Sequence, residues 1–219
     1  MPVGVPKVPF LIDGDEEASW TELYYVLYHR RILFLGEEIK PEISNQLVGL
    51  MVYLSLADNE KDLYMFINSP GGEVISGMAI YDGMQFVDTQ VHTICMGIAA
   101  SMASLILIGG EIFKRLAFPH ARIMIHEPAS SFFDGQMREC RLEESVLKDI
   151  HEDILYIYTE RACKSYTEIT NDIERDSFLS ADEARSYGLI DEIAHSYTSQ
   201  YLFGTKKEYE DEDDSDPRS

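Results

Sequence analysis

Three residue types in this chain could together carry out acyl-transfer chemistry, although they lie far apart in the sequence. Ser101 stands inside the run from Thr89 to Gly110, His126 ends an apolar segment, and Asp176 precedes a short apolar segment. A serine becomes a nucleophile when a histidine takes its proton, and a carboxylate is needed to orient that histidine. Each of these residues alone also has a plain structural explanation, and sequence order alone does not place them together.

The run from Thr89 to Gly110 contains no acidic or basic residue except His92, and it has three interpretations. It could be a membrane span, a buried strand followed by a buried helix, or a turn that presents a nucleophile between them. A membrane helix needs about 20 predominantly apolar residues, whereas small and polar residues fill this run (Gln90, Thr93, Gly97, Ala99, Ala100, Ser101 and Ser104). We therefore predict a strand over 91–96 and a helix from near Ser101 to Gly109. The small residues suit either close packing or room for a substrate, so the role of Ser101 stays open.

A second candidate element is the Gly71-Gly72 pair, which we expect in a turn between a strand at 63–67 and a helix at 74–86. Consecutive glycines permit positive φ and a close approach of the backbone to a ligand. The pair is either an ordinary turn or, with the N–H of Met102, one half of a two-donor oxyanion hole. The loss of one such donor typically costs about 3 kcal/mol in the transition state.

The remaining pattern alternates strands with helices and predicts an α/β fold in one domain, residues 21–196, with mobile ends at 1–20 and 197–219. For the helix at 74–86 we expect the apolar residues Ile75, Met78, Ala79, Met84 and Phe86 on its buried side. Ser180 and Glu183 fit a capping box at the start of a short helix. Further strands are expected at 31–35, 122–125 and 189–193, and further helices from Pro41 to Asp58 and over 135–163.

Composition narrows the function classes. The formal net charge is −21, which argues against nucleic-acid binding because phosphate contacts need clustered Lys and Arg. The tail from Lys206 to Ser219 is acidic, and such a run is typical of disorder. Three cysteines without paired spacing predict neither a disulfide framework nor a metal site. The N-terminus resembles neither a secretory signal nor a transit peptide.

Taken together, the segments resemble one family, the proteolytic subunits of the ATP-dependent Clp protease, and most of all the form encoded in plant plastid genomes. The resemblance covers roughly residues 20 to 195. The matching pieces include Phe66-Ile-Asn-Ser-Pro-Gly-Gly72, Thr93-Ile-Cys-Met-Gly97, Ala99-Ala-Ser-Met102, Met124-Ile-His126 and Phe178-Leu-Ser-Ala181.

The resemblance implies a serine endopeptidase with Ser101 as nucleophile, His126 as general base and acid, and Asp176 as the orienting carboxylate. It implies the backbone N–H groups of Gly72 and Met102 as the oxyanion hole, and no cofactor or metal in this chain. The implied fold is crotonase-like, with repeated ββα units and a long protruding helix, the handle, over 135–163. On that helix Leu142, Val146, Ile150 and Ile154 share one face, with Leu147 and Tyr158 alongside.

The implied partners are other Clp proteolytic subunits, in two heptameric rings that form a barrel, and a hexameric AAA+ ATPase that uses ATP and delivers unfolded proteins. Tyr64, Phe66 and Phe86, here called the docking patch, match the residues on which such an ATPase docks, although they could equally be core residues. The N-terminal residues would line the axial pore. The implied location is the chloroplast stroma, with no membrane span.

The chain departs from the family pattern at Glu73, at Ala103 and at the segment Ala129-Ser130-Ser131. Two other functions remain as alternatives. A crotonase-type acyl-CoA hydratase or isomerase would share the fold but use carboxylates, and a non-catalytic subunit would only build the ring.

Overall fold

The computed structural model of this chain describes residues 4–11, 17–126, 137–195, 198 and 202, and it describes no side chains for 137–145 and 147. The acidic tail, the Ala129-Ser130-Ser131 departure and the side chains of Leu142 and Leu147 therefore lie outside the described residues.

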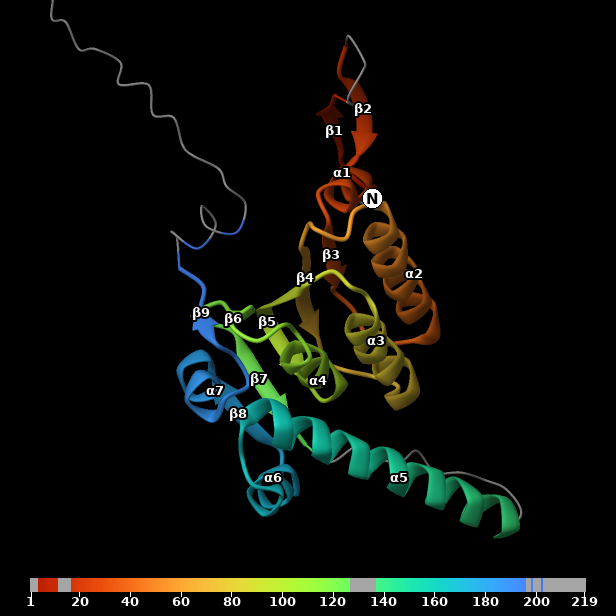
Figure 1. The fold of residues 1–219 in the computed structure, drawn as a ribbon, viewed down its shortest axis with the longest axis vertical. Coiled ribbons are helices and arrows are strands. Elements are labelled where there is room, and N and C mark those ends of the chain that lie inside the picture. Colours follow the sequence, from red (N-terminus) through yellow and green to blue (C-terminus); the bar gives the residue numbers. More distant parts are fainter. Residues whose placement is uncertain (1–3, 12–16, 127–136, 196–197, 199–201, 203–219) are drawn as a thin grey trace, which may run out of the picture.

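The described chain alternates strands and helices, as the sequence pattern predicts (Figure 1). The strands are β1 (Lys7–Phe10), β2 (Ser19–Glu22), β3 (Ile32–Leu35), β4 (Leu63–Ser69), β5 (Val91–Ala100), β6 (Arg115–Ala117), β7 (Arg122–Ile125), β8 (Ser177–Ser180) and β9 (Glu192–Ile193). The helices are α1 (Leu23–His29), α2 (Pro41–Ala57), α3 (Val74–Phe86), α4 (Met102–Ile108), α5 (Met137–Ala162), α6 (Tyr166–Ile173) and α7 (Ala181–Tyr187).

One sheet organises the molecule, with strand order β3-β4-β5-β6-β9, and β5 is its central strand. The first part of β5 pairs with β6, whereas its last part, Ile98–Ala100, pairs with β7. Between these parts the register against β4 shifts, at Gly97 with φ +83°. The side chain of Asn68 holds the shifted segment, because its Oδ1 accepts the N–H of Ile98 at 3.2 Å. Along one edge, β5 therefore exchanges β6 for β7 as its neighbour just before the chain reaches Ser101.

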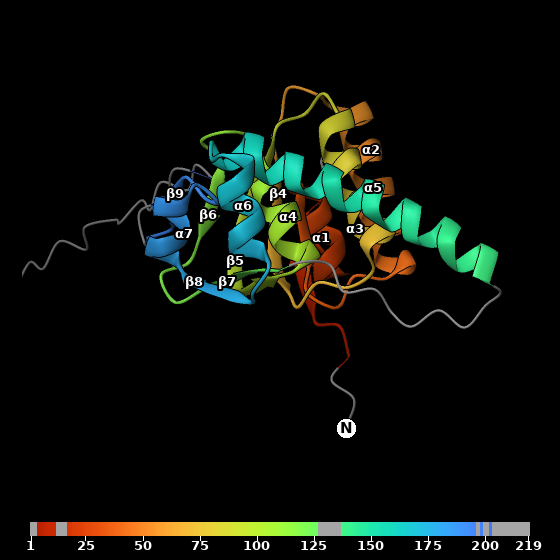
Figure 2. The ribbon, with the colours of Figure 1, turned by 90° about the horizontal axis from the view of Figure 1, so that it is seen from below.

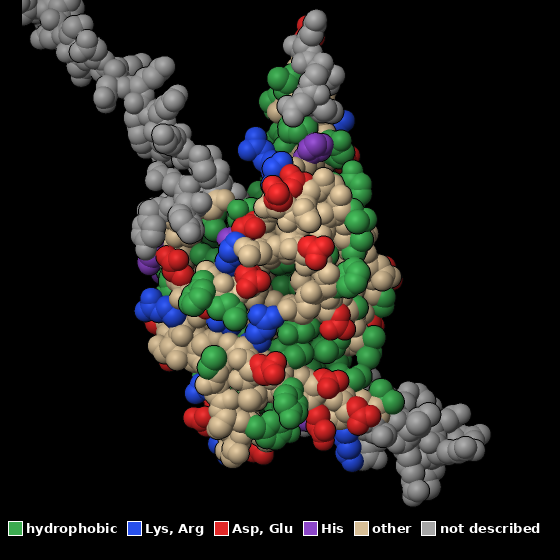
Figure 3. Space-filling view, in the orientation of Figure 1, with side chains coloured by type: hydrophobic (Ala, Val, Ile, Leu, Met, Phe, Trp, Pro, Cys, Tyr) green, Lys and Arg blue, Asp and Glu red, His purple; other side chains and the backbone are tan. Residues whose placement is uncertain are grey.

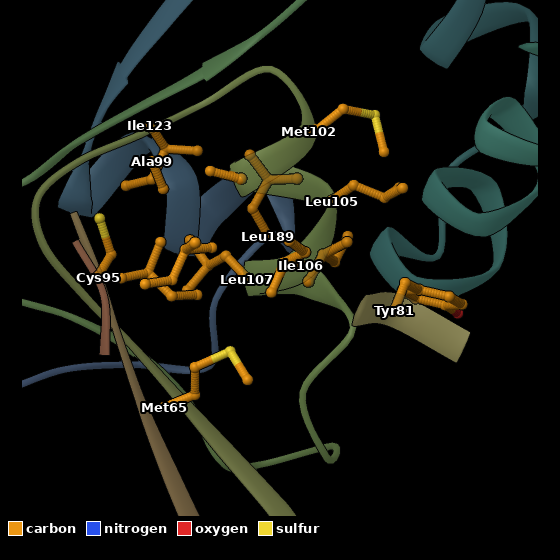
Figure 4. Packing of buried hydrophobic residues seen from close by; sticks show 14 of the residues in the cluster. Met65, Tyr81, Cys95, Ala99, Met102, Leu105, Ile106, Leu107, Ile123 and Leu189 are labelled. Atoms are coloured by element: carbon orange, nitrogen blue, oxygen red, sulfur yellow. The ribbon is translucent and has the colours of Figure 1, made fainter. Parts of the chain in front are cut away.

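The two faces of the sheet are covered differently. Along β4, Leu63, Met65 and Ile67 are fully buried, while Tyr64 and Phe66 on the opposite face are half-buried. The buried face packs against the helices, and the side chains of α4 lie among Met65, Cys95, Ala99 and other core residues (Figure 4). This packing places the apolar half of the Thr89–Gly110 run in the core.

The prediction of a strand followed by a helix over this run is confirmed, since β5 turns at Ser101 into the seven-residue α4. Among the described residues, no helix combines the length and the apolar character that crossing a membrane requires.

The predicted buried side of α3 is only partly confirmed. Ile75 and Phe86 are 64% and 79% exposed, and Ala79 is exposed too, while Met84 is buried and Met78 packs at the edge of the core. The helix instead turns Ser76, Gly77 and Gly83 inward with Ile80 and Tyr81. Small residues are needed there because a Cβ on Gly77 would lie 2.7 Å from the side chain of Met102.

The long helix α5 has two parts. Its C-terminal part packs in the core through Ile154 and Tyr158, each 3% exposed, with Ile150 at the edge. Its N-terminal part runs away from the rest of the molecule, and Val146 is 48% exposed (Figure 2). Ile154 and Tyr158 are therefore covered by this chain itself.

The ends differ from the sequence expectations in two places. Near the N-terminus, where mobile residues were expected over 1–20, β1 and β2 pair with each other in antiparallel fashion. The last strand is shorter than expected: Leu189 and Ile190 are buried outside regular structure, and only Glu192–Ile193 pair with β6. The capping box at Ser180 and Glu183 is confirmed, and α7 ends at Gly188 in the left-handed conformation, with φ +97°.

Candidate active site

Ser101 lies at a sharp turn between β5 and α4, in a backbone conformation that serine seldom adopts. Its φ is +56° and its ψ is −127°. A non-glycine residue in such a conformation costs about 1–3 kcal/mol and persists only where the surroundings hold it. This strand-to-helix turn resembles the one that presents a nucleophile in other hydrolases. The strain at Ser101 is therefore consistent with a functional role.

Several hydrogen bonds hold this turn in place. The N–H of Ser101 donates to the carbonyl of Met124 at 3.0 Å, which ties the serine to β7. The carbonyl of Ser101 accepts from the N–H of Ser104 at 2.9 Å and from its hydroxyl at 2.6 Å. The Ser104 hydroxyl also contacts the hydroxyl of Tyr158 on α5 at 2.8 Å. Both ends of the serine backbone are thus fixed by hydrogen bonds.

The Gly71-Gly72 turn lies directly beside Ser101. A Cβ on Gly71 would lie 2.7 Å from the Cβ of Ser101 and 3.2 Å from the backbone N of Met102. Gly71 and Gly72 have φ values of +93° and +154°. The turn is also held by Ser69, whose buried hydroxyl accepts the N–H of Gly71 at 3.1 Å. Glycine is required at Gly72 because a Cβ there would lie 2.2 Å from the carbonyl of Ile39.

Two peptide units at this turn have their carbonyls anchored on the side away from the site. The Gly71 carbonyl accepts the N–H of Ile39 at 2.8 Å, and the Ser101 carbonyl accepts from Ser104. In a trans peptide the C=O and the following N–H point in opposite directions. The N–H groups of Gly72 and Met102 are therefore both directed away from those anchors. Since a Cβ on Gly71 would meet both Ser101 and Met102, these two donors belong to the same small region.

His126 and Asp176 form the second part of the site. His126 follows β7, Asp176 precedes β8, and these strands pair antiparallel, which brings the two side chains together. His126 Nδ1 lies 3.3 Å from Asp176 Oδ1. Because Ala100 pairs with Met124, His126 follows the strand beside Ser101. The carboxylate of Asp176 is 68% exposed, so water surrounds it in the single chain.

The structure thus joins Asp176 to His126 by a hydrogen bond and places Ser101 at the end of the neighbouring strand. The hydrogen bonds of the described residues include none between Ser101 and His126. Catalytic hydrogen bonds are often long without substrate and tighten when substrate binds. The Nδ1 contact to Asp176 leaves the other ring nitrogen of His126, Nε2, available for the serine.

Two other groups on β5, Cys95 and His92, are unsuited to the same role. Burial raises the pKa of the Cys95 thiol to about 12, so this cysteine stays protonated and unreactive. His92 hydrogen-bonds Asp62 at 2.8 Å, but it is buried on β5 under the ring of Tyr64. Burial lowers the pKa of His92. Among the described residues, no cluster of His, Cys, Asp and Glu could hold a metal ion.

The docking patch is only partly assembled. Tyr64 and Phe66 pack with Ile94 on the less covered face of the sheet, and the Tyr64 hydroxyl donates to the carbonyl of Leu202 at 2.9 Å. Phe66 and Ile94 also line a groove of about 480 Å³ with Phe118 and Leu202. Phe86 is exposed at the end of α3 and does not line this groove.

The two described departures from the family pattern lie close to the site. Glu73 follows Gly72; it is exposed and accepts a hydrogen bond from the Ser76 hydroxyl at 2.9 Å. Ala103 follows Met102 and is fully buried in the core. Neither departure displaces the turn, because the N–H of Glu73 still donates to Ile39 at 3.0 Å.

Comparisons with known proteins identify the family of this chain. The family model described as Clp protease matches residues 14–197. An ATP-dependent Clp protease proteolytic subunit of Nicotiana tabacum is 60% identical over 194 residues, which is 89% of this chain and 99% of the relative. Proteins of the same description from Spinacia oleracea and Epifagus virginiana are 60% and 58% identical over the same extents.

The chain therefore belongs to the Clp protease family, which is a family of serine peptidases. The predicted family, the mixed α/β fold and the hydrolase class are confirmed. The family match also disfavours an acyl-CoA hydratase.

The sequence interpretation missed the residues that support the site. Ser104 and Tyr158 hold the Ser101 carbonyl, and Ser69 holds the Gly71 N–H. Ser104 had a visible signal, because a serine at three residues after Ser101 can reach back to its carbonyl within one helical turn. The pairing of Tyr158 with Ser104 spans 54 positions and had no signal in a single sequence.

Proposed function

We propose that this chain is a catalytic subunit of a barrel-shaped, ATP-dependent Clp protease, with Ser101, His126 and Asp176 as its catalytic triad. The observation that carries this proposal is the strained Ser101 turn beside Gly71, with the His126–Asp176 pair at the ends of neighbouring strands. The same observation disfavours a non-catalytic subunit, which would have no need of a strained serine.

In the proposed mechanism, Ser101 Oγ attacks the carbonyl carbon of a peptide bond while Nε2 of His126 takes the hydroxyl proton. Asp176 holds the tautomer with the proton on Nδ1 and stabilises the imidazolium that forms. The N–H groups of Gly72 and Met102 donate to the developing oxyanion. His126 then protonates the leaving amine, and water releases the acyl group from Ser101 in a second, equivalent step.

The proposed assembly consists of heptameric rings of Clp proteolytic subunits stacked into a barrel through the projecting part of α5. An AAA+ ATPase would dock at the groove beside Tyr64 and Phe66, with Phe86 as a further exposed apolar contact. It would use ATP to deliver unfolded proteins, and this chain itself would need no cofactor. The groove supports this role because its lining is largely apolar and includes Phe66, Ile94 and Phe118.

No nucleic acid belongs to this proposal. On the face that Figure 3 shows, the Lys and Arg side chains of the described residues are scattered among acidic ones rather than gathered in one patch.

The proposed location is the chloroplast stroma, which the plant origin of the relatives supports. We also propose the division into an axial segment at 1–20, a peptidase domain at 21–196 and an acidic tail at 197–219.

Mass spectrometry of the native complex after reaction with diisopropyl fluorophosphate tests the proposal. It reports the assembly mass, the mixture of subunits and the modified residue together. We expect one label per chain at Ser101 in a tetradecamer. An assembled complex that hydrolyses peptides without any label at Ser101 would contradict the catalytic role of this chain.

Unchanged proteolysis by a complex that contains Ser101→Ala in place of this subunit would support the non-catalytic alternative.

A second pair of variants tests the docking patch. Phe66→Ser is expected to weaken ATPase binding, while peptide hydrolysis by the free barrel stays unchanged. Tyr53→Ser, which alters an exposed aromatic residue on α2, serves as its control.

A further inference from the structure

A buried chain of hydroxyl groups connects helix α5 to the nucleophile turn. Tyr158 on α5 contacts Ser104 on α4 at 2.8 Å, and Ser104 contacts the carbonyl of Ser101 at 2.6 Å. Tyr158 is 3% exposed and Ser104 is fully buried. Water therefore has no access with which to replace either contact.

The direction of these hydrogen bonds follows from the number of protons. A carbonyl oxygen only accepts, so the single hydroxyl proton of Ser104 is directed to Ser101. The Tyr158 hydroxyl must then donate to Ser104 Oγ. Each hydroxyl polarises the next one in such a chain, which strengthens the final bond to the carbonyl. Burial raises the pKa of Tyr158, so its hydroxyl keeps the proton that it donates.

The acceptor at the end of this chain is the carbonyl of the Ser101–Met102 peptide. The other end of that peptide is the Met102 N–H, one of the two proposed oxyanion donors. Because the peptide is planar and trans, a rotation that weakens the carbonyl anchor also turns the Met102 N–H away from the oxyanion. The backbone at Ser101 is strained, with φ +56°. Loss of an anchor therefore lets the turn relax to a conformation of lower free energy.

We propose that Ser104 and Tyr158 are positioning residues for the oxyanion hole, and that the seating of α5 against the core sets the orientation of the Met102 N–H. This inference rests on the proposed function of Ser101. Ile154 and Tyr158 belong to the same buried part of α5. A displacement of the projecting part of this helix is thus transmitted to the Tyr158 hydroxyl and onward to the turn. Ser104 and Tyr158 are both buried and therefore out of the reach of a substrate.

The test compares wild type with Tyr158→Phe, Ser104→Ala and the double variant. Tyr187→Phe is a matched control, because the Tyr187 hydroxyl donates to Asp172 at 2.7 Å without a connection to Ser101. Native mass spectrometry first establishes that each variant assembles. The measurements are kcat and KM for a fluorogenic peptide and the rate constant for labelling by diisopropyl fluorophosphate.

For Tyr158→Phe we expect kcat and the labelling rate to fall about tenfold with KM unchanged, the upper range for one hydrogen bond. Ser104→Ala should show at least this loss, and the double variant should be no worse than Ser104→Ala. Tyr187→Phe should stay within about twofold of wild type. A merely structural role would reduce the amount of assembled enzyme but leave its kcat per active site unchanged.

The inference is overturned if assembled Tyr158→Phe retains the wild-type kcat, or if the losses of the two single variants multiply in the double variant. If Tyr158→Phe does not assemble, Ser104→Ala decides alone, because it leaves α5 intact: wild-type kcat in that variant also overturns the inference. Failure of the proposed function is distinct, since the wild-type complex itself would then remain unlabelled at Ser101.

Discussion

Among the described residues, His92 and Asp62 form a closer pair than His126 and Asp176, yet the closer pair is not the candidate for catalysis. His92 and Asp62 lie 2.8 Å apart, and Lys114 contacts the same carboxylate at 2.6 Å. His126 and Asp176 lie 3.3 Å apart, and the Asp176 carboxylate is 68% exposed. In the first pair His92 is buried and Asp62 is half-buried, whereas the carboxylate of the second pair is open to solvent in the single chain.

The difference shows that neighbours, rather than hydrogen-bond length, distinguish a catalytic pair from a structural one. His92 lies under Tyr64, and no serine hydroxyl contacts it among the described residues. His126 lies beside a strained serine and a glycine turn whose N–H groups are directed away from their anchors. A catalytic base must also reach substrate, which requires an opening that a structural pair does not need.

The strongest test of this comparison replaces each histidine in turn. His126→Ala is expected to lower kcat by about 10⁶, the size seen when a triad histidine is removed from a serine protease. His92→Gln should keep kcat within about threefold, because it alters no group at the reaction centre. The measurement is hydrolysis of a fluorogenic peptide per assembled complex. A large loss of kcat for His92→Gln together with a small one for His126→Ala would assign catalysis to the His92–Asp62 pair instead.

Replacement of the two aspartates should lower kcat in the same order, with the larger loss at Asp176. Asp176→Asn is expected to permit assembly but to lower kcat by about 10⁴, since the amide favours the wrong tautomer of His126. Asp62→Asn is the matched change in the pair with His92 and should affect thermal stability more than kcat. Steady-state kinetics and thermal melts on both variants give the answer. A loss below tenfold for Asp176→Asn would remove Asp176 from the mechanism.

A third prediction concerns the Gly71-Gly72 turn, which belongs to the site of His126 and Asp176. Gly72→Ala is expected to lower kcat by about 10²–10³, the cost of losing one oxyanion donor, because its Cβ would lie 2.2 Å from the Ile39 carbonyl and displace the turn. Gly49→Ala, where a Cβ meets nothing within 4 Å, is the control. Assembled Gly72→Ala with normal turnover would show that the Gly72 N–H does not contribute.

The smallest expected effect is the pH dependence of stability. Burial lowers the pKa of His92 below its usual 6.5, so folding favours the neutral ring. The corresponding stability is fully present above pH 6.5 and is lost as pH falls through the folded-state pKa. Asp62, whose pKa is lowered by its hydrogen bonds with Lys114 and His92 despite burial, stays ionised throughout this range.

Between pH 7.5 and 5.5 we expect the melting temperature of the wild type to fall by about 1–3 °C more than that of His92→Gln. Differential scanning fluorimetry at both pH values measures the difference. Equal shifts in the two proteins would mean that His92 does not titrate in this window.

The sequence predicted the elements that carry the site better than the packing around them. The strand before Ser101, the helix after it and the bounds of α3 all follow from local pattern. The prediction for α3 failed at Ile75, Ala79 and Phe86, because apolar character alone does not decide which side of a helix is buried. The tertiary packing selects Gly77 and Gly83 instead, since only small residues let α3 approach its neighbours. Contacts such as Tyr158 with Ser104 depend on the fold and leave no trace in local spacing.

The candidate triad shows the same division. The residue types and the resemblance to a family named Ser101, His126 and Asp176 in advance. The structure adds the 3.3 Å contact of the last two and the strain at the first. The exposure of Asp176 could not be predicted, because burial of a charged side chain depends on which surfaces the folded chain covers.

The change of neighbours along β5 has a consequence for local opening. Because β5 pairs with β4 along one edge and with β6 and then β7 along the other, most of its amides are enclosed by strands on both sides. Such amides exchange their hydrogens only when the whole domain unfolds. The backbone that carries Ser101 should therefore exchange as slowly as any in the protein, while the β7–β8 edge that carries His126 opens at lower free energy.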